Sequence, residues 1–347
     1  RSRNVSVGLF YRVAGKGIVQ MVKALTLPAR HELELHPTAP YHFDASMHKT
    51  DHFPSADNAW TPGVRWQTMS WQDVLLGLKL ENQGTVDRPN IALSIWAERK
   101  LEQGFLESLK DEIVYRYNLD LDLSEFYARF VDDPTLGPIL KTWRGLRPLS
   151  PGSLYAYLMV AIVLQNAVIR RSIQMMQTLF EAYGTRLAYD GRELYGFWAP
   201  ARLEDVSEAE LRALKVGYRA KSILRVTDAF LQGRIDARAL RRAPKDERRR
   251  ALLDLYGIGP ASVWYILFDV YHQWDELNHV SPWEQKIYSK LFFGRDPEDP
   301  VPADEILRVL DERFVEWKML AVHYIWEDLF WRREHEPLPW LEALIRR

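Results

Sequence analysis

The fold is decided by the stretch Leu252-Leu253-Asp254-Leu255-Tyr256-Gly257-Ile258-Gly259-Pro260-Ala261-Ser262. One helical pattern ends in this stretch and another begins directly after it, so the two glycines reverse the chain while Ile258 fills the interior. The free amides and positive dipole end of the second helix would form a phosphate site. Such a hairpin grips a DNA backbone without reading bases, although a plain helix–helix connection with a C-terminal glycine has the same pattern.

A carboxylate follows at the start of the next predicted helix, in Asn278-His279-Val280-Ser281-Pro282-Trp283-Glu284-Gln285-Lys286-Ile287-Tyr288. Together with the hairpin, this order resembles the helix-hairpin-helix (HhH-GPD) base-excision DNA glycosylases, in which a Gly/Pro-rich loop leads from the hairpin to a catalytic Asp. The resemblance is closest to the 3-methyladenine DNA glycosylase II and 8-oxoguanine glycosylase branch. It covers about residues 146–331, through the segments Leu146-Arg147-Pro148, 161–166, 179–184, 211–223 and 317–326.

The chain as a whole is close to electrically neutral, with 46 basic and 47 acidic residues among 347. The net charge of the whole chain is therefore too small to attract nucleic acid or a membrane. Residues 212–250 alone carry thirteen Lys or Arg against four acids, which permits a local contact with a polyanion; a solvated helical face is the alternative. The lack of any cysteine excludes disulfides, a Cys-ligated zinc or iron–sulfur site and a thiol nucleophile.

Strand-like patterns give way to helical ones at about residue 97. Short runs punctuated by prolines, such as Val5–Val13, His31–Leu35 and Ile91–Trp96, are typical of strands. Helical periodicity follows, for example over Leu154–Val168 and Ile169–Tyr183, after a Gly/Pro-rich break at residues 134–151.

The predicted class is therefore α+β, mainly α, with an antiparallel β-rich N-terminal domain over residues 1–96 and a two-part, all-helical body. In that body, residues 97–150 and 283–347 would form one helical domain beside the catalytic cleft. Residues 151–282 would form a helical barrel domain with the helix-hairpin-helix at about 246–273.

A cluster of histidines and aspartates lies in the segment His42–Trp66, which we expect to be a loop. His42, His48 and His52 lie near three aspartates, as in some metal sites. No helical His pair or tight chelating spacing supports a metal, so a metalloenzyme is the weakest of the hypotheses considered and no metal ligand is assigned.

The resemblance places the family's catalytic Asp on Glu284, because Ile287 stands three residues beyond it as the family pattern requires. A carboxylate there would stabilise the oxocarbenium-like charge and orient the attacking water. Glu is a departure from Asp, and its extra methylene moves the carboxylate by roughly 1.5 Å. A helix-start acid without catalytic function is the alternative, and Asp275 and Glu276 are reserve candidates.

Bifunctional members of the family carry a Schiff-base Lys at the position of Ala261, so the resemblance implies a monofunctional enzyme that uses water. It also implies that Gln165 and Asn166 fill the gap left by a flipped base; a polar helix cap is the alternative. The residues expected to contact the DNA backbone are Gly257, Ile258, Gly259, Ala261, Ser262, Arg219 and Lys221. Candidates for an aromatic base pocket are Trp264, Tyr265, Trp283, Tyr155 and Tyr157, although helical aromatics more often belong to a core.

The function predicted is a monofunctional DNA glycosylase for base excision repair, acting on double-stranded DNA that contains a damaged or modified base, with alkylated purines favoured. A bulky base such as glucosylated hydroxymethylcytosine of phage DNA, in antiviral defence, and an oxidised purine are alternatives. A non-catalytic DNA-binding protein of the same fold is the rival from another class. The family implies no cofactor beyond a monovalent cation at the hairpin, and a monomer.

We expect a cytoplasmic protein, associated with the nucleoid in a prokaryote, because neither a signal-peptide pattern nor an apolar run of about 18 residues occurs.

Overall fold

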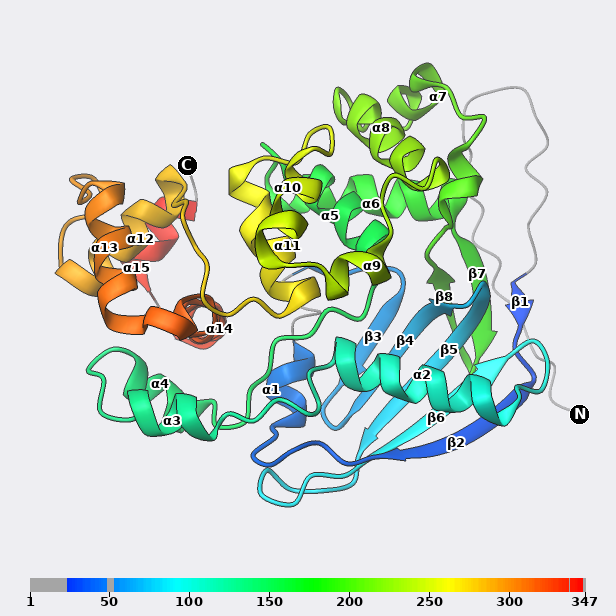
Figure 1. Ribbon diagram of the computed structural model, residues 1–347, viewed down its shortest axis with the longest axis horizontal. Coiled ribbons are helices and arrows are strands. Elements are labelled where there is room, and N and C mark those ends of the chain that lie inside the picture. Colours follow the sequence, from blue (N-terminus) through cyan, green and yellow to red (C-terminus); the bar gives the residue numbers. More distant parts are fainter. Residues whose placement is uncertain (1–23, 49–52, 337, 346–347) are drawn as a thin grey trace, which may run out of the picture.

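A five-stranded antiparallel sheet forms most of the N-terminal part (Figure 1). The computed structural model describes residues 24–48, 53–336 and 338–345. The strand order is β2-β6-β5-β4-β3. The strands are β2 (Ala29–Leu35), β3 (Asn58–Thr61), β4 (Val64–Trp71), β5 (Val74–Asn82) and β6 (Ile91–Ala97).

Helix α2 (Gln103–Arg116) covers one face of this sheet (Figure 1). It buries Leu106, Leu109 and Ile113, whose spacing places them on one side of a helix. On the sheet, the alternate residues Leu76, Leu78 and Leu80 of β5 are completely buried. A leucine that leaves water in this way contributes about 1.5–3 kcal/mol, so this cluster anchors the N-terminal part.

The helical body contains the helices that follow α2. They are α3 (Ser124–Phe130), α4 (Leu136–Thr142), α5 (Leu154–Leu164), α6 (Ile169–Tyr183), η2 (Pro200–Leu203), α7 (Glu208–Ala213), α8 (Arg219–Leu231), α9 (Ala237–Arg242), α10 (Lys245–Leu253), α11 (Pro260–Tyr271), α12 (Pro282–Phe293), α13 (Ala303–Phe314), η3 (Val315–Trp317), α14 (Lys318–His335) and α15 (Pro339–Ile345). The group α5 to α11 lies beside a second group formed by α12 to α15 (Figure 1). The predicted class, a β-rich N-terminal part followed by a mainly helical body with a helix-hairpin-helix, is confirmed.

A β-hairpin that the sequence analysis did not predict interrupts the body. Strands β7 (Thr185–Tyr189) and β8 (Arg192–Gly196) pair with each other, and β1 (Leu25–Thr26) pairs with β7 in parallel. The hairpin packs on the first sheet, where the Thr68 hydroxyl donates to the Tyr195 carbonyl at 2.7 Å. A side chain on Gly77 would place its Cβ 2.5 Å from the Tyr189 ring, so the two layers meet at a glycine.

Two expected loops contain regular structure. The segment His42–Trp66 includes helix α1 (Phe43–Met47) and strand β3, and the break at 134–151 includes α4. Pro138 is tolerated in α4 because it stands in the first turn, where its missing amide proton has no partner to lose. The predicted strand Val5–Val13 lies outside the described residues.

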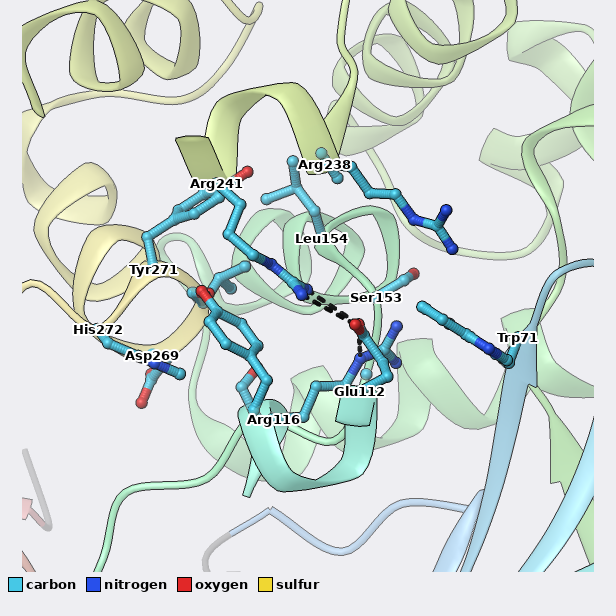
Figure 2. Close-up of a pocket in the computed structure, with 15 residues that line it drawn as sticks. Trp71, Glu112, Arg116, Ser153, Leu154, Arg238, Arg241, Asp269, Tyr271 and His272 are labelled. Atoms are coloured by element: carbon cyan, nitrogen blue, oxygen red, sulfur yellow. Dashed lines mark hydrogen bonds and ion pairs between the residues drawn. The ribbon is translucent and has the colours of Figure 1, made fainter. Parts of the chain in front are cut away.

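A buried ion cluster ties α2 to the body. Glu112 accepts two hydrogen bonds from Arg241 of α9, both at 2.9 Å, and one from Arg116 at 2.7 Å. Figure 2 shows Glu112 between these two arginines at the wall of a pocket of about 130 Å³. Burial alone would raise the pKa of Glu112, but the two guanidinium groups hold it below its ordinary value.

No helix in the described ranges is long and apolar enough to cross a membrane.

Candidate nucleic-acid interface and base cavity

The hairpin between α10 and α11 has the geometry that its glycines suggest. Gly257 has φ +86°, and a Cβ there would lie 2.7 Å from the Ser222 hydroxyl oxygen, so only glycine fits without strain. Ile258 is 6% exposed and joins the core of the body. Gly259 is the N-cap of α11 and supplies no side-chain cap, so the first amides of this helix have no capping side chain.

A cavity of about 660 Å³ opens between this hairpin and the end of α5. Its lining includes predicted DNA-contact residues from the hairpin and the predicted gap-filling residues at the end of α5. The lining residues are Tyr157, Val160, Ala161, Leu164, Gln165, Asn166, Gly257, Gly259, Ala261, Ser262 and Tyr265. No lysine is found among these described residues.

The two predicted gap-filling residues lie at the mouth of the cavity. The Gln165 amide donates to the Gly257 carbonyl at 2.7 Å, so it is fixed to the hairpin. Asn166 adopts the left-handed conformation with φ +48°, which places its side chain beside the hydroxyl of Tyr218 at 3.2 Å.

Tyr218 is a site residue that the sequence analysis did not single out. It is 51% exposed beside Asn166, and the guanidinium of Arg219 lies 4.7 Å from its ring centroid. The ring is thus held at the surface by a cation–π contact, with one face free for a partner. Its position in the segment Gly217-Tyr218-Arg219, already quoted for its resemblance, is the signal that could have identified it.

The two predicted backbone-binding cations have different environments. Arg219 is only 7% exposed and donates a hydrogen bond to the Gln165 carbonyl, so it supports the end of α5 rather than facing solvent. Lys221 is exposed, with its ammonium group 5.1 Å from the Tyr256 ring centroid.

Several cations of the basic stretch 212–250 bind other groups of the protein. Arg241 binds Glu112, and the buried Arg248 donates to the carbonyl of Leu240 and the side chain of Gln273, both at 2.8 Å. The stretch is therefore not one continuous phosphate-binding face. Its exposed cations include Lys215, Lys221, Arg225, Arg238, Arg242 and Arg250.

Glu284 lies at the N-terminal turn of α12, where a capping box controls its side chain. The Ser281 hydroxyl accepts from the Glu284 amide, and the Glu284 carboxylate accepts from the Ser281 amide at 2.8 Å. The side chain is thus folded back to the helix start, and the residue is 8% exposed.

Tyr265 connects Glu284 to the cavity. Its ring lines the cavity, and its hydroxyl donates a hydrogen bond to Glu284. Burial, with the neighbouring Tyr288 and Glu284, raises the pKa of Tyr265 well above its ordinary value, so the hydroxyl remains protonated.

The reserve carboxylates are engaged elsewhere. Asp275 forms an ion pair with Lys245, and Glu276 lies 3.3 Å from Arg249.

The structure separates the five candidates for an aromatic base pocket. Tyr157 and Tyr265 line the cavity. Tyr155 is buried with its hydroxyl 2.8 Å from that of Thr227, and Trp264 is 7% exposed in the core, so neither lies in the lining. Trp283 is 37% exposed and stacks on Trp326, with ring centroids 5.3 Å apart.

The histidine-rich segment has structural contacts where it is described. His42 caps α1 by accepting from the Ala45 amide at 3.2 Å, and His48 lies 3.7 Å from Glu334. No group of three or more potential metal ligands occurs within the described ranges, while His52 lies outside them.

Comparison with known proteins gives relatives of one kind. No protein-family model matches the chain. A probable N-glycosylase/DNA lyase of Methanothermobacter thermautotrophicus is 27% identical over 212 residues, which are 56% of this chain and 67% of the relative. A DNA-3-methyladenine glycosylase of Bacillus subtilis is 23% identical over 238 residues, which are 67% of this chain and 76% of the relative.

A solved structure supports the same relationship at the level of the fold. The 8-oxoguanine glycosylase/lyase of Clostridium acetobutylicum, solved with duplex DNA containing cytosine opposite 8-oxoguanine, has a TM-score of 0.67 and 17% identity. The match covers 90% of this chain and 99% of that chain.

The chain is a homologue of the helix-hairpin-helix DNA glycosylases. Its homologues and structural neighbours are of the 8-oxoguanine and 3-methyladenine types. Ala261 in the hairpin and Glu284 at the start of α12 stand at the positions that the sequence analysis predicts for the family's Schiff-base Lys and catalytic Asp.

Proposed function

We propose that the chain is a monofunctional DNA glycosylase that flips an abnormal base out of duplex DNA and hydrolyses its N-glycosidic bond. One observation carries the proposal: the hairpin and the amides of Gln165 and Asn166 line a single cavity, and the buried carboxylate of Glu284 accepts a hydrogen bond from Tyr265 of the cavity wall. The homologues, which are named as DNA glycosylases, support this class of activity.

DNA would be held at two places. The backbone N–H of Ala261, in the first turn of α11, would bind a phosphate group, while exposed cations such as Lys221 neutralise neighbouring phosphates. Gln165 and Asn166 would occupy the space of the flipped base, because amide groups can pair with the orphaned partner base. Tyr218, exposed beside Asn166, would insert at the adjacent base step, as exposed side chains of kinking proteins do.

Bond cleavage would depend on Glu284. As the glycosidic bond lengthens, positive charge develops on the sugar, and a fixed carboxylate stabilises it and orients a water molecule for attack. The capping box and Tyr265 hold that carboxylate in place before the substrate arrives. Since the methyl group of Ala261 cannot form a Schiff base, water is the nucleophile and the abasic strand remains intact.

The favoured substrate is an alkylated purine. A cationic base leaves readily, so a cavity with apolar and tyrosine walls, with the Glu284 carboxylate bound to Tyr265, suffices without a strong general acid.

The test is a panel of duplexes, each with one alkylated, oxidised, deaminated or glucosylated base, followed by hot alkali to cleave abasic sites. Strand breaks that require alkali are expected for alkylated purines. Breaks without alkali would contradict the monofunctional mechanism, and breaks confined to an oxidised or glucosylated base would replace the substrate assignment. Binding without any excision would favour the rival, a DNA-binding protein.

A further inference from the structure

Two tyrosines in the cavity wall are each hydrogen-bonded to a carboxylate, and the proposed mechanism uses only one of these two pairs. Tyr157 of α5 and Tyr265 of α11 both line the cavity, and each donates its hydroxyl proton to a carboxylate. The acceptor for Tyr157 is Asp269, at 2.5 Å, and the acceptor for Tyr265 is Glu284.

Asp269 approaches Tyr157 from behind the cavity. It stands one helical turn beyond Tyr265 on α11 and belongs to the lining of the neighbouring pocket (Figure 2). The Tyr157–Asp269 pair therefore forms a partition between the two hollows. Burial and the adjacent Asp269 raise the pKa of Tyr157 well above its ordinary value, so the phenol keeps its proton.

A phenol whose single proton is held by a carboxylate can only accept further hydrogen bonds. The hydrogen bond to the carboxylate also polarises the phenol and strengthens its oxygen as an acceptor. Apart from the two tyrosines, the polar side chains of the lining are those of Gln165 and Asn166 at the end of α5 and of Ser262 in the hairpin. A base that reaches Tyr157 and Tyr265 in this cavity thus meets two phenol oxygens that accept and do not donate.

We infer that Tyr157 and Tyr265 are specificity-determining residues that select flipped bases presenting N–H donors to the cavity wall. This inference rests on the proposed function, since it assigns to that cavity the recognition of a base. A base edge with only acceptors would leave its own lone pairs and the two phenol oxygens unpaired, and unpaired buried polar groups are costly. Exocyclic amines and protonated ring nitrogens would be accepted.

The test measures binding of two small probes, 9-methyladenine and 9-methylpurine, which share a ring and differ by the exocyclic amine. The full chain is bound to a duplex with a tetrahydrofuran abasic site, so that no base competes for the cavity. Dissociation constants come from ligand-observed NMR titrations. The wild type should bind 9-methyladenine about 2- to 12-fold more tightly, because one net hydrogen bond contributes about 0.5–1.5 kcal/mol.

The variants Tyr157→Phe and Tyr265→Phe keep the rings and remove the acceptors. Each should reduce the preference for 9-methyladenine, and Tyr155→Phe, which removes a core hydroxyl of α5 outside the cavity lining, should retain it. Circular dichroism and thermal unfolding establish that each variant is folded. The double ratio of dissociation constants cancels any general weakening of the cavity.

Equal preferences in the wild type and in both cavity variants would overturn the inference. A wild type without a preference, or one that binds neither probe, would overturn it as well. Excision in the duplex panel is scored separately. Excision without a probe preference would refute only the selection of N–H donors by Tyr157 and Tyr265. A preference without excision would refute catalysis and leave that selection supported.

Discussion

The two hairpin glycines should respond differently to the same substitution. Gly257→Ala forces a side chain into the left-handed region, at a cost of roughly 1–2 kcal/mol. The new Cβ would also meet the Ser222 hydroxyl at 2.7 Å, and displacing a packed group costs about 1–3 kcal/mol more. We expect Gly257→Ala to lower the free energy of unfolding by about 2–5 kcal/mol, the sum of these two costs.

Gly259→Ala is the matched control within the same turn. Its φ of −121° is open to any residue, and no atom of the described chain lies within 4 Å of the new Cβ. The cost should be at most about 1 kcal/mol, from the poorer N-cap that Ala makes. Its effect should instead appear in DNA affinity, because the methyl group would stand where a phosphate approaches the start of α11. A hydrogen bond to a charged group is worth about 1.5–3 kcal/mol, so the dissociation constant should rise about tenfold or more.

Urea unfolding measures the stability of both variants, and fluorescence anisotropy with a labelled duplex at fixed salt measures affinity. Replacing Ser222 by Ala in the Gly257→Ala background should recover part of the lost stability, because it removes the clashing hydroxyl. Equal destabilisation by both glycine substitutions would refute the conformational reasoning. Unchanged DNA affinity of Gly259→Ala would refute the role of the hairpin as a phosphate grip.

Two further predictions concern stability and pH. Glu112→Gln should lower the free energy of unfolding by about 3–5 kcal/mol, since it leaves Arg116 and Arg241 without their buried carboxylate partner. Glu208→Gln, in an exposed ion pair, should lower it by at most about 1 kcal/mol. A loss below about 1 kcal/mol for Glu112→Gln in urea unfolding would contradict the role of the buried ion cluster. Burial and two nearby arginines lower the pKa of His272 to about 3, so the unfolded chain takes up a proton below about pH 6.5 while the folded chain does not. Stability should therefore fall by up to about 1.4 kcal/mol per pH unit from pH 6.5 towards 3 through this residue, and His272→Asn, which tolerates the left-handed φ of +57°, should remove that part of the slope. An identical pH slope in the variant would show that His272 is not responsible.

Much of the fold could be predicted because local chemistry and tertiary role agree. Ile258 between two glycines indicates a turn with a buried apolar plug, and Ile258 is buried there. The hairpin β7–β8 was missed although Asp190-Gly191 is a typical two-residue turn, with φ values of +47° and +70°. Its strands are short and lie within a helical region, so helical periodicity on both sides outweighed the turn signal.

The site was harder to predict because its geometry depends on contacts distant in sequence. Ser281-x-x-Glu284 can be recognised as a capping box from the sequence, but the hydrogen bond from Tyr265 cannot. Arg219 was expected at the phosphates, yet its guanidinium is needed by the carbonyl of Gln165 at the end of α5. A charge pattern reports the sign of a side chain and not the direction in which tertiary packing turns it.

The most direct test of the proposed mechanism compares Glu284→Gln with the wild type on the duplex that the panel identifies. Gln keeps the size of the side chain and can still form the capping box, so folding and DNA affinity should be preserved. The single-turnover excision rate at saturating protein should fall by about 10²–10⁴-fold, the range typical for loss of an acid–base group. Asp275→Asn, which alters a carboxylate already paired with Lys245, should excise at close to the wild-type rate. Excision by Glu284→Gln at the wild-type rate would contradict the assignment of catalysis to this residue.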